Sequence, residues 1–315
     1  MRVLLLRRHH QGGLGAHVDE LAVRLPHHGA SAIVEDAGTW MPNEAGGRYD
    51  RDTTRMLRDR AESVDLVHAF GPRAAWACAE AFGDRESWVY TLIDPPKTLA
   101  GPMIERLNLA ALGLAGSHLT LNRLVGAGVS GVEALYPGIA IEPSPTRTRE
   151  EARNLLGLAE DDLVVGAMSD HGLMAAFEQT ETGKLLMVST TAVQPENDRI
   201  IVKDWMPRPE DAILASDLWV VPDRDRGYAR NAAKAMALGI PVLLRAGFRE
   251  MVDEDQSGYL FVEDEALPGR IDEILGIPLS REVVGRAGAL RARERFDVDA
   301  TAARIADLYR DVLTE

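Results

Sequence analysis

Short apolar runs alternate with amphipathic stretches along the whole chain. The aliphatic run at residues 3–6 predicts a strand that is buried on both faces, and it leads through a glycine-rich loop into a stretch of helical periodicity. Repetition of this unit predicts parallel βαβ connections with helices on both faces of a sheet. The first half is predicted to contain strands at 3–6, 32–34, 65–70, 88–93, 118–121 and 132–136, and helices at 14–25 and 72–82.

A polar, proline-bearing segment at 142–149 has no periodicity and predicts a linker. The alternation resumes after it, so the sequence predicts an α/β fold with two doubly wound, Rossmann-like domains at 1–142 and 146–290. The second half is predicted to contain strands at 163–167, 184–189, 199–202, 218–221, 241–244 and 258–262, and helices at 151–156, 172–177, 209–215, 229–238 and 280–313.

The composition narrows the class of protein. A length of 315 residues favours two domains. The 35 basic and 49 acidic residues give a formal charge of −14, which argues against nonspecific nucleic-acid binding but allows a local cationic pocket. Cys78 is the only cysteine, which excludes an intramolecular disulfide and a cysteine-based zinc site. The apolar run at the N-terminus is too short for a signal peptide or a membrane span, so we expect a soluble, cytoplasmic protein without a membrane span.

Five motifs lie in order along the chain, at 11–22, 65–70, 136–138, 222–242 and 258–262. They resemble those of the retaining group 1 glycosyltransferases, the GT-B family related to sucrose and glycogen synthases. The resemblance implies two Rossmann-like domains that face a cleft, with the acceptor on the first domain and a sugar nucleotide on the second. It also implies that a C-terminal helix at 291–315 packs back on the first domain.

The resemblance breaks at the donor site. The family uses two glutamates to bind the sugar hydroxyls and the ribose, and the matching positions hold Arg226 and Lys234. Carboxylates accept hydrogen bonds from hydroxyls, whereas cations only donate. Losing two such contacts removes about 3–6 kcal/mol, or on the order of 10²–10⁴ in donor affinity. The resemblance therefore implies an altered donor pocket.

Two further family positions differ. Ala167 stands where the family has an arginine that neutralises the diphosphate, and the matching lysine is represented only by Asp170 or His171. Ile93 stands where the family has a histidine near the acceptor.

Three residues are candidates for catalysis. We expect His17, on the first helix, to lie in the cleft between the domains. His68 ends a predicted strand, where ligand crevices form in α/β domains, although a hydrogen-bonded histidine at the sheet edge fits equally well. Asp94 has the same position on the next strand, although it also suits a turn before two prolines.

The candidates for binding the nucleotide lie near glycine loops and on a cationic helix face. Gly12 and Gly13 could cradle a phosphate at a helix N-terminus, or they could simply form a tight turn. Arg226, Arg230 and Lys234 follow i, i+4, i+8 spacing, which predicts either a replacement anion site or a solvated face balanced by nearby aspartates. The full set of binding candidates is Gly12, Gly13, Ser169, Arg226, Gly227, Tyr228, Arg230 and Lys234.

No cofactor or metal is expected, because no carboxylate stands at a suitable spacing from His9, His10 and His17. The leading hypothesis is a group 1 glycosyltransferase-like protein that transfers a sugar from a sugar nucleotide to an unknown carbohydrate or small-molecule acceptor. The alternative is a catalytically inactive pseudo-glycosyltransferase that serves as a binding or partner subunit. A third possibility is other GT-B chemistry, such as a sugar-nucleotide epimerase.

Overall fold

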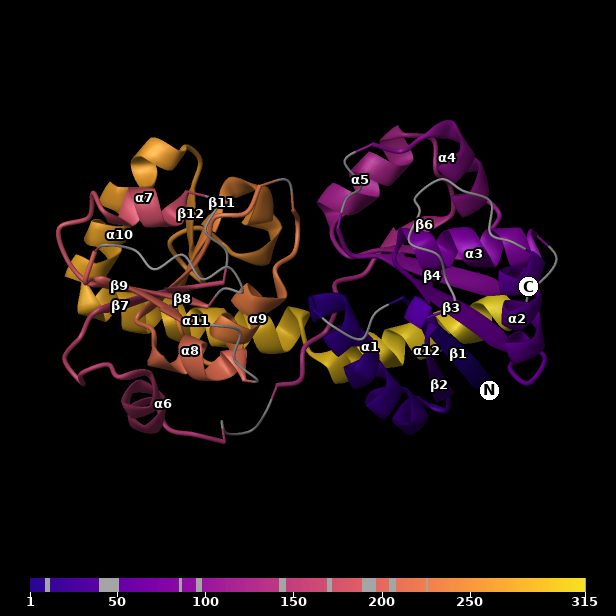
Figure 1. Cartoon of the computed structure of the whole chain (residues 1–315), viewed down its shortest axis with the longest axis horizontal. Helices are drawn as coiled ribbons and strands as arrows, with labels where there is room; N and C mark the ends of the chain where they lie inside the picture. Colours follow the sequence, from indigo (N-terminus) through magenta and orange to yellow (C-terminus); the bar gives the residue numbers. More distant parts are fainter. Residues whose placement is uncertain are drawn as a thin grey trace. The chain divides into compact units, whose positions relative to one another are not determined.

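The computed structural model divides the chain into two compact units, Met1–Ala140 with Phe296–Glu315, and Ile141–Arg295. Each unit is built on a six-stranded sheet in which every strand pair is parallel (Figure 1). The fold class predicted from the alternation of strands and helices is confirmed. The structure describes residues 1–8, 12–39, 51–84, 87–94, 98–141, 146–168, 172–188, 197–203, 208–224 and 226–314.

The first sheet has the strand order β2-β1-β3-β4-β5-β6. Its aliphatic strands alternate between two apolar layers, because successive side chains point to opposite faces. Leu4 and Leu6 of β1 (Arg2–Arg7) pack toward α3 (Pro72–Phe82), whereas Val3 and Leu5 pack toward α1 (Gly12–Arg24) and α12 (Val298–Thr314). The strands are β1 (Arg2–Arg7), β2 (Ser31–Asp36), β3 (Leu66–Phe70), β4 (Trp88–Leu92), β5 (Leu112–Ala115) and β6 (Val132–Ala134). The helices are α1 (Gly12–Arg24), α2 (Arg51–Ala61), α3 (Pro72–Phe82), α4 (Gly101–Leu107), α5 (His118–Gly126) and α12 (Val298–Thr314), with short 3₁₀ turns at Leu25–His28 and Ala37–Thr39.

The predicted strand at 118–121 is wrong. These residues begin helix α5, because the Ser117 hydroxyl accepts a hydrogen bond from the Thr120 backbone N–H and caps the helix. The fifth strand is β5, which precedes the cap. Its glycine hides it from pattern analysis, yet Gly113 is needed there because a Cβ would overlap the Tyr90 side chain.

The second sheet has the strand order β12-β11-β10-β7-β8-β9 (Figure 1). Its strands are β7 (Val164–Ala167), β8 (Lys184–Val188), β9 (Ile200–Lys203), β10 (Leu218–Val221), β11 (Val242–Arg245) and β12 (Tyr259–Phe261). The helices are α6 (Arg149–Leu156), α7 (Leu173–Phe177), α8 (Pro209–Ala215), α9 (Arg230–Ala237), α10 (Leu267–Gly276) and α11 (Pro278–Arg295), with 3₁₀ turns at Ala246–Met251 and Asp264–Ala266.

The second half of the predicted linker is already part of the fold. Thr148 and Glu151 form a reciprocal capping box at the start of α6. Arg149 and the buried Arg153 then share the carboxylate of Asp217, at 2.7 and 2.8 Å, and fasten α6 to the segment before β10. Residues 142–145 lie outside the described part of the chain.

The single helix predicted at 280–313 is two helices. Phe296 is fully buried, and the Asp297 carboxylate accepts a hydrogen bond from the Asp299 backbone N–H at 2.9 Å. This cap starts α12 anew, and Ile139 pairs with Asp297 as an isolated parallel bridge. Helix α12 then packs on α1 within the first unit.

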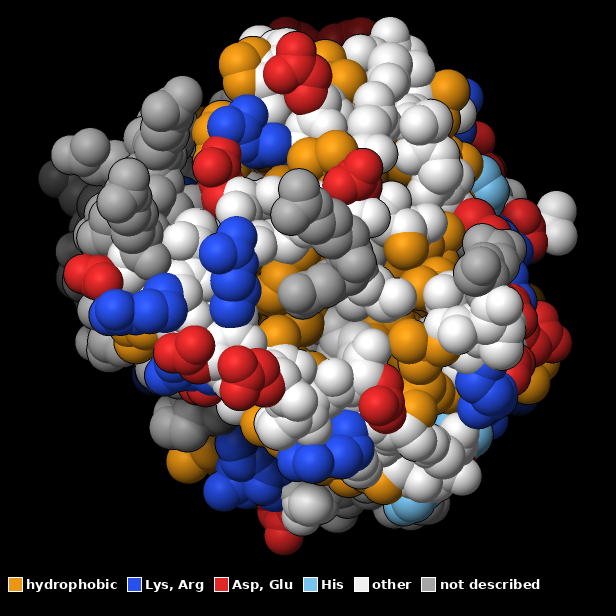
Figure 2. All heavy atoms as spheres, turned by 90° about the vertical axis from the view of Figure 1, so that its right-hand side faces the viewer, with side chains coloured by type: hydrophobic (Ala, Val, Ile, Leu, Met, Phe, Trp, Pro, Cys, Tyr) orange, Lys and Arg blue, Asp and Glu red, His pale blue; other side chains and the backbone are white. Residues whose placement is uncertain are grey.

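The surface of the first unit carries both signs of charge. On the face in Figure 2, acidic and basic side chains stand beside one another, with apolar patches between them. Ion pairs such as Arg310–Asp307 on α12 are of this exposed kind. Within the described ranges, no helix combines the length and the apolar character needed to cross a bilayer.

Candidate functional site

The two strand orders locate a ligand edge in each unit. In the first sheet, the connections from β1 and β3 leave in opposite directions; in the second sheet, those from β7 and β10 do so. Open α/β sheets bind ligands at the carboxyl ends of the strands beside such a switch point. The segments after β1 and β10 lie at these points, and they hold Gly12 and Gly13 in the first unit and Arg226, Gly227 and Tyr228 in the second.

At the first edge, the glycine loop runs directly into a helix. Helix α1 begins at Gly12, whose φ of +78° suits glycine, and Gly12 and Gly13 are both exposed. The buried Arg7, which sequence reasoning missed, holds this turn: its Nη1 donates to the Gly15 carbonyl at 2.7 Å. Its Nε donates to the Asp36 carboxylate at the end of β2 at 2.6 Å. The sequence did contain a signal for this role of Arg7, because a charged residue stands at the end of an aliphatic strand.

His68 lies in the core of the first unit. Its side chain is 0% exposed, Nδ1 is 2.6 Å from the Tyr309 hydroxyl, and Nε2 is 2.7 Å from the Thr91 hydroxyl. Its ring also stacks on Phe70, with 4.0 Å between centroids. Burial, with a smaller contribution from His17, lowers the pKa of His68 to about 3. These contacts favour a structural role, in which the neutral imidazole joins two strands to α12.

His17 and Asp94 have opposite environments. The His17 side chain is 2% exposed and meets Phe70 edge-on, so it packs inside the first unit. Asp94 is exposed, two residues beyond the end of β4. Of the three predicted catalytic residues, Asp94 alone is open to solvent at the carboxyl edge.

A polar pair at the same edge escaped sequence reasoning. His118 is exposed at the start of α5, and its Nδ1 lies 3.2 Å from the Tyr136 hydroxyl, just beyond β6. The Tyr136 ring meets the buried Phe296 edge-on at 5.6 Å. The mistaken strand at 118–121 concealed this pair, because it moved His118 away from the sheet edge.

At the second edge, the cationic residues do not share one helical face. Helix α9 begins only at Arg230, so Arg226 belongs to the preceding loop and the spacing argument holds only for Arg230 and Lys234. The Arg226 side chain is 50% exposed and forms a distant ion pair with Asp223 at 3.8 Å. Gly227 and Tyr228, the next two residues of the loop, are buried.

Lys234 has a defined carboxylate partner. Its Nζ donates to Glu210 at the start of α8, and both side chains are about one-third exposed or less. Burial acts to raise the pKa of Glu210, but the hydrogen bond and charge of Lys234 outweigh it, and the pKa is lowered. A carboxylate is therefore present beside α9, although it comes from α8.

Ser169, Asp170 and His171 lie outside the described residues, as do His9 and His10. Within the part of the chain that the structure describes, no three histidine, cysteine, aspartate or glutamate side chains gather in a possible metal site.

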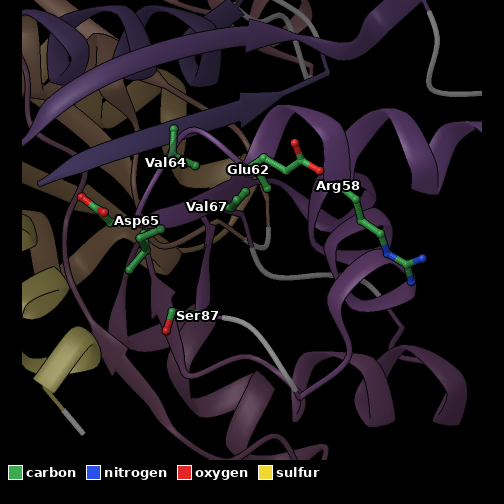
Figure 3. A pocket seen from close by; sticks show the side chains of 8 residues that line it. Arg58, Glu62, Val64, Asp65, Val67 and Ser87 are labelled. Atoms are coloured by element: carbon green, nitrogen blue, oxygen red, sulfur yellow. The ribbon is translucent and has the colours of Figure 1, made fainter.

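A hollow of about 450 Å³ lies at the opposite end of the first sheet. Arg58 of α2 and Asp65 and Ser87, which precede β3 and β4, line it (Figure 3). These residues stand at the amino ends of the strands, away from the switch point, and none is a predicted site residue.

Two tandem Rossmann-like units, each with a loop at its switch point, define the GT-B class, and solved structures agree. A crystal structure of Anabaena Alr3699/HepE in complex with UDP superposes with a TM-score of 0.78, at 20% identity, over 99% of this chain and 100% of that chain. No family model matches the chain.

Curated relatives carry glycosyltransferase names. The D-inositol 3-phosphate glycosyltransferase of Thermobispora bispora is 34% identical over 113 residues, and D-inositol 3-phosphate glycosyltransferase 1 of Catenulispora acidiphila is 25% identical over 258 residues. The matches cover 34% and 70% of this chain, but only 26% and 61% of these relatives' own lengths. The fold is therefore that of the GT-B glycosyltransferases, and the curated relatives that the chain matches in part are named as glycosyltransferases.

Proposed function

We propose that the chain transfers a sugar from a sugar nucleotide to a carbohydrate or small-molecule acceptor, with the donor at the carboxyl edge of the second sheet. The observation that carries the proposal is the loop at 222–229, described at 222–224 and 226–229, which leaves β10 at the switch point and holds an exposed Arg226 next to the buried Gly227. HepE, which has the same fold, is solved with UDP and with UDP and glucose.

The proposed donor site uses reversed charges. Arg226 offers a guanidinium to an anionic group, whereas the ribose-binding carboxylate of the family would come from Glu210, held by Lys234. Compared with the family pattern, the carboxylate is thus on α8 and a cation stands on α9. Such a site would still accept hydrogen bonds from ribose hydroxyls, because a carboxylate has more acceptor positions than the one that Lys234 occupies.

The acceptor would bind at the carboxyl edge of the first sheet. Asp94 and the His118–Tyr136 pair offer an exposed carboxylate, an exposed imidazole and a half-buried phenol there. By its resemblance to the retaining family, the reaction would preserve the anomeric configuration of the sugar, which NMR of the product would test.

Nucleotide binding is the decisive experiment. We expect one of UDP, GDP or ADP, or a matching sugar nucleotide, to raise the melting temperature of the natural protein. A ligand at a hundred times its dissociation constant adds about 2.7 kcal/mol, or a shift of a few degrees. Arg226→Glu should abolish the shift, and Arg286→Glu, an exposed arginine on α11, should leave it intact.

If no nucleotide shifts the natural protein, the transferase proposal fails. A shift that survives Arg226→Glu would retain nucleotide binding but overturn the role given to this loop. A shift that appears only in a variant with Arg226→Glu and Lys234→Glu would indicate a lost donor site, and hence a non-catalytic binding or partner subunit.

A further inference from the structure

The carboxyl edge of the second sheet contains a nearly buried arginine that has no part in the proposed ligand contacts. Arg245 is the last residue of β11, the middle one of the neighbouring strands β10, β11 and β12. It is 8% exposed, and its guanidinium lies over the Phe261 ring, 4.8 Å from the centroid. A guanidinium in such a place needs acceptors for its five N–H groups, because an unpaired buried charge is costly.

Arg245 finds these acceptors in the segments that leave the strands on both sides. Its Nε donates to the Pro222 carbonyl at 2.9 Å, directly after β10. Its Nη1 donates to the Val262 carbonyl at 3.0 Å, directly after β12, and its Nη2 donates to the Asp264 carboxylate. One side chain therefore joins the exits of three adjacent strands.

A second arginine reinforces the loop after β10. Arg224 donates to the other carboxylate oxygen of Asp264, so the loop at 222–229 is attached at Pro222 and again at Arg224. The hydrogen bond from Arg245 is the main reason that the pKa of Asp264 lies below its usual range. Asp264 is therefore charged at neutral pH and can hold both guanidinium groups.

The far end of the same loop packs against the segment that follows Arg245. The Ala229 backbone N–H lies 3.3 Å from the Met251 sulfur. A Cβ at Gly247 would lie 3.2 Å from the Arg226 carbonyl oxygen, so the two backbones nearly touch. A displacement of the chain after β11 would therefore be transmitted to Arg226.

We infer that Arg245 is a positioning residue for the donor site: it fixes the loop at 222–229, and thereby sets the affinity of the second unit for a nucleoside diphosphate. The part of this inference that concerns nucleotide affinity rests on the proposed function, whereas the part that concerns the fixing of the loop does not. A lysine could not substitute, because its single ammonium cannot reach carbonyls on both sides as the planar guanidinium fork does.

Arg245→Lys tests the inference against a matched control, Arg270→Lys. Arg270 also lies over an aromatic ring, Tyr259, and binds two carboxylates, Asp255 and Glu273. It bonds Asp255 in the turn before β12, at the other end of that strand. Both substitutions keep the charge, so a difference between them reports the position of the contacts.

Hydrogen exchange on the full chain without ligand gives the first measurement. The amides of Tyr228 and Ala229 should exchange about tenfold faster in Arg245→Lys than in the natural protein, because charge-assisted hydrogen bonds to the loop are lost. In Arg270→Lys, the same amides should exchange at about the rate of the natural protein. Titration with UDP, or with the nucleoside diphosphate that binds the natural protein, should show affinity reduced about tenfold in Arg245→Lys alone.

Unchanged exchange in Arg245→Lys overturns the inference, and so does faster exchange with unchanged nucleotide affinity. If the natural protein binds no nucleotide, the proposed function fails, and exchange alone decides whether Arg245 fixes the loop. If Arg245→Lys does not fold, Asp264→Asn removes the shared charge but keeps the two carbonyl contacts. Its Tyr228 and Ala229 amides must then exchange faster, or the inference is wrong.

Discussion

The polar networks that join neighbouring strands differ between the two units, although both units contain a parallel six-stranded sheet. In the first unit, a neutral and fully buried imidazole joins β3, β4 and α12 through the hydroxyls of Thr91 and Tyr309. In the second unit, Arg245 and a half-exposed Asp264 join three strand exits.

This difference shows that the fold does not determine which polar groups join its strands. The apolar layers on the two faces of each sheet stabilise the architecture, so the polar contacts at the edges can differ. A neutral buried network is insensitive to salt but vulnerable to acid, since charging an imidazole in the core is costly. An ionic, partly exposed network is screened by salt and contributes less to stability. The His68 network of the first unit is thus expected to be the more rigid, and the Arg245 network of the second unit the more easily altered.

The largest expected effect is at the buried His68 network of the first unit. His68→Leu should lower the free energy of unfolding by about 2–4 kcal/mol, because it leaves two buried hydroxyls without their partner. Urea denaturation at pH 7 measures this loss. His27→Gln, on the exposed surface, should change stability by less than about 0.5 kcal/mol. Equal effects of the two substitutions would contradict the structural role of His68.

The pH dependence sharpens the same contrast. The folded-state pKa of His68, about 3, is below the unfolded value near 6.5, so its contribution is complete above pH 6.5 and is lost as the pH falls toward 3. Between pH 7 and pH 5 the free energy of unfolding should fall by about 2 kcal/mol, because over about 1.5 pH units the histidine is protonated in the unfolded chain but not in the folded protein. Urea denaturation at both pH values should show this difference in the natural protein and in His27→Gln. In His68→Leu it should be smaller by that amount, and an unchanged difference would refute the assignment.

At the second edge, the Lys234–Glu210 pair should show coupling but a smaller cost. Lys234→Glu places two carboxylates together and should cost about 1 kcal/mol, limited by partial exposure. Adding Glu210→Lys restores opposite charges and should recover most of the loss. A double-mutant cycle by urea denaturation measures the coupling. Additive effects would mean that the two side chains do not interact in solution.

The smallest expected effect is that of Gly247→Ala. The new Cβ would lie 3.2 Å from the Arg226 carbonyl, so the loop must move by a few tenths of an ångström. We expect a loss below about 1 kcal/mol in thermal unfolding. Gly269→Ala on α10, where the added carbon meets open space, should be neutral or slightly stabilising. A larger loss at Gly269 than at Gly247 would show that the loop does not approach as described.

Local patterns in the sequence determined much of the architecture. Helices α3 and α8 and strand β10 have the predicted bounds, because buried strands and amphipathic helices leave a periodicity that neighbouring residues alone reveal. Helices α2, α4 and α10 were missed, and β5 was missed because its glycine weakens the strand pattern. The cap at Thr148 had a readable signal in Glu151 three residues later.

The sequence by itself also marked the glycine loop and the charge-reversed positions Arg226 and Lys234, but it could not name their partners. Tertiary structure alone decided that His68 is a core residue, that Lys234 binds Glu210, and that Arg245 joins three strand exits. The reason is physical. Periodicity reports which face of an element is buried, whereas these contacts join residues far apart in the chain, and only the strand order and the packing of helices bring them within hydrogen-bonding distance.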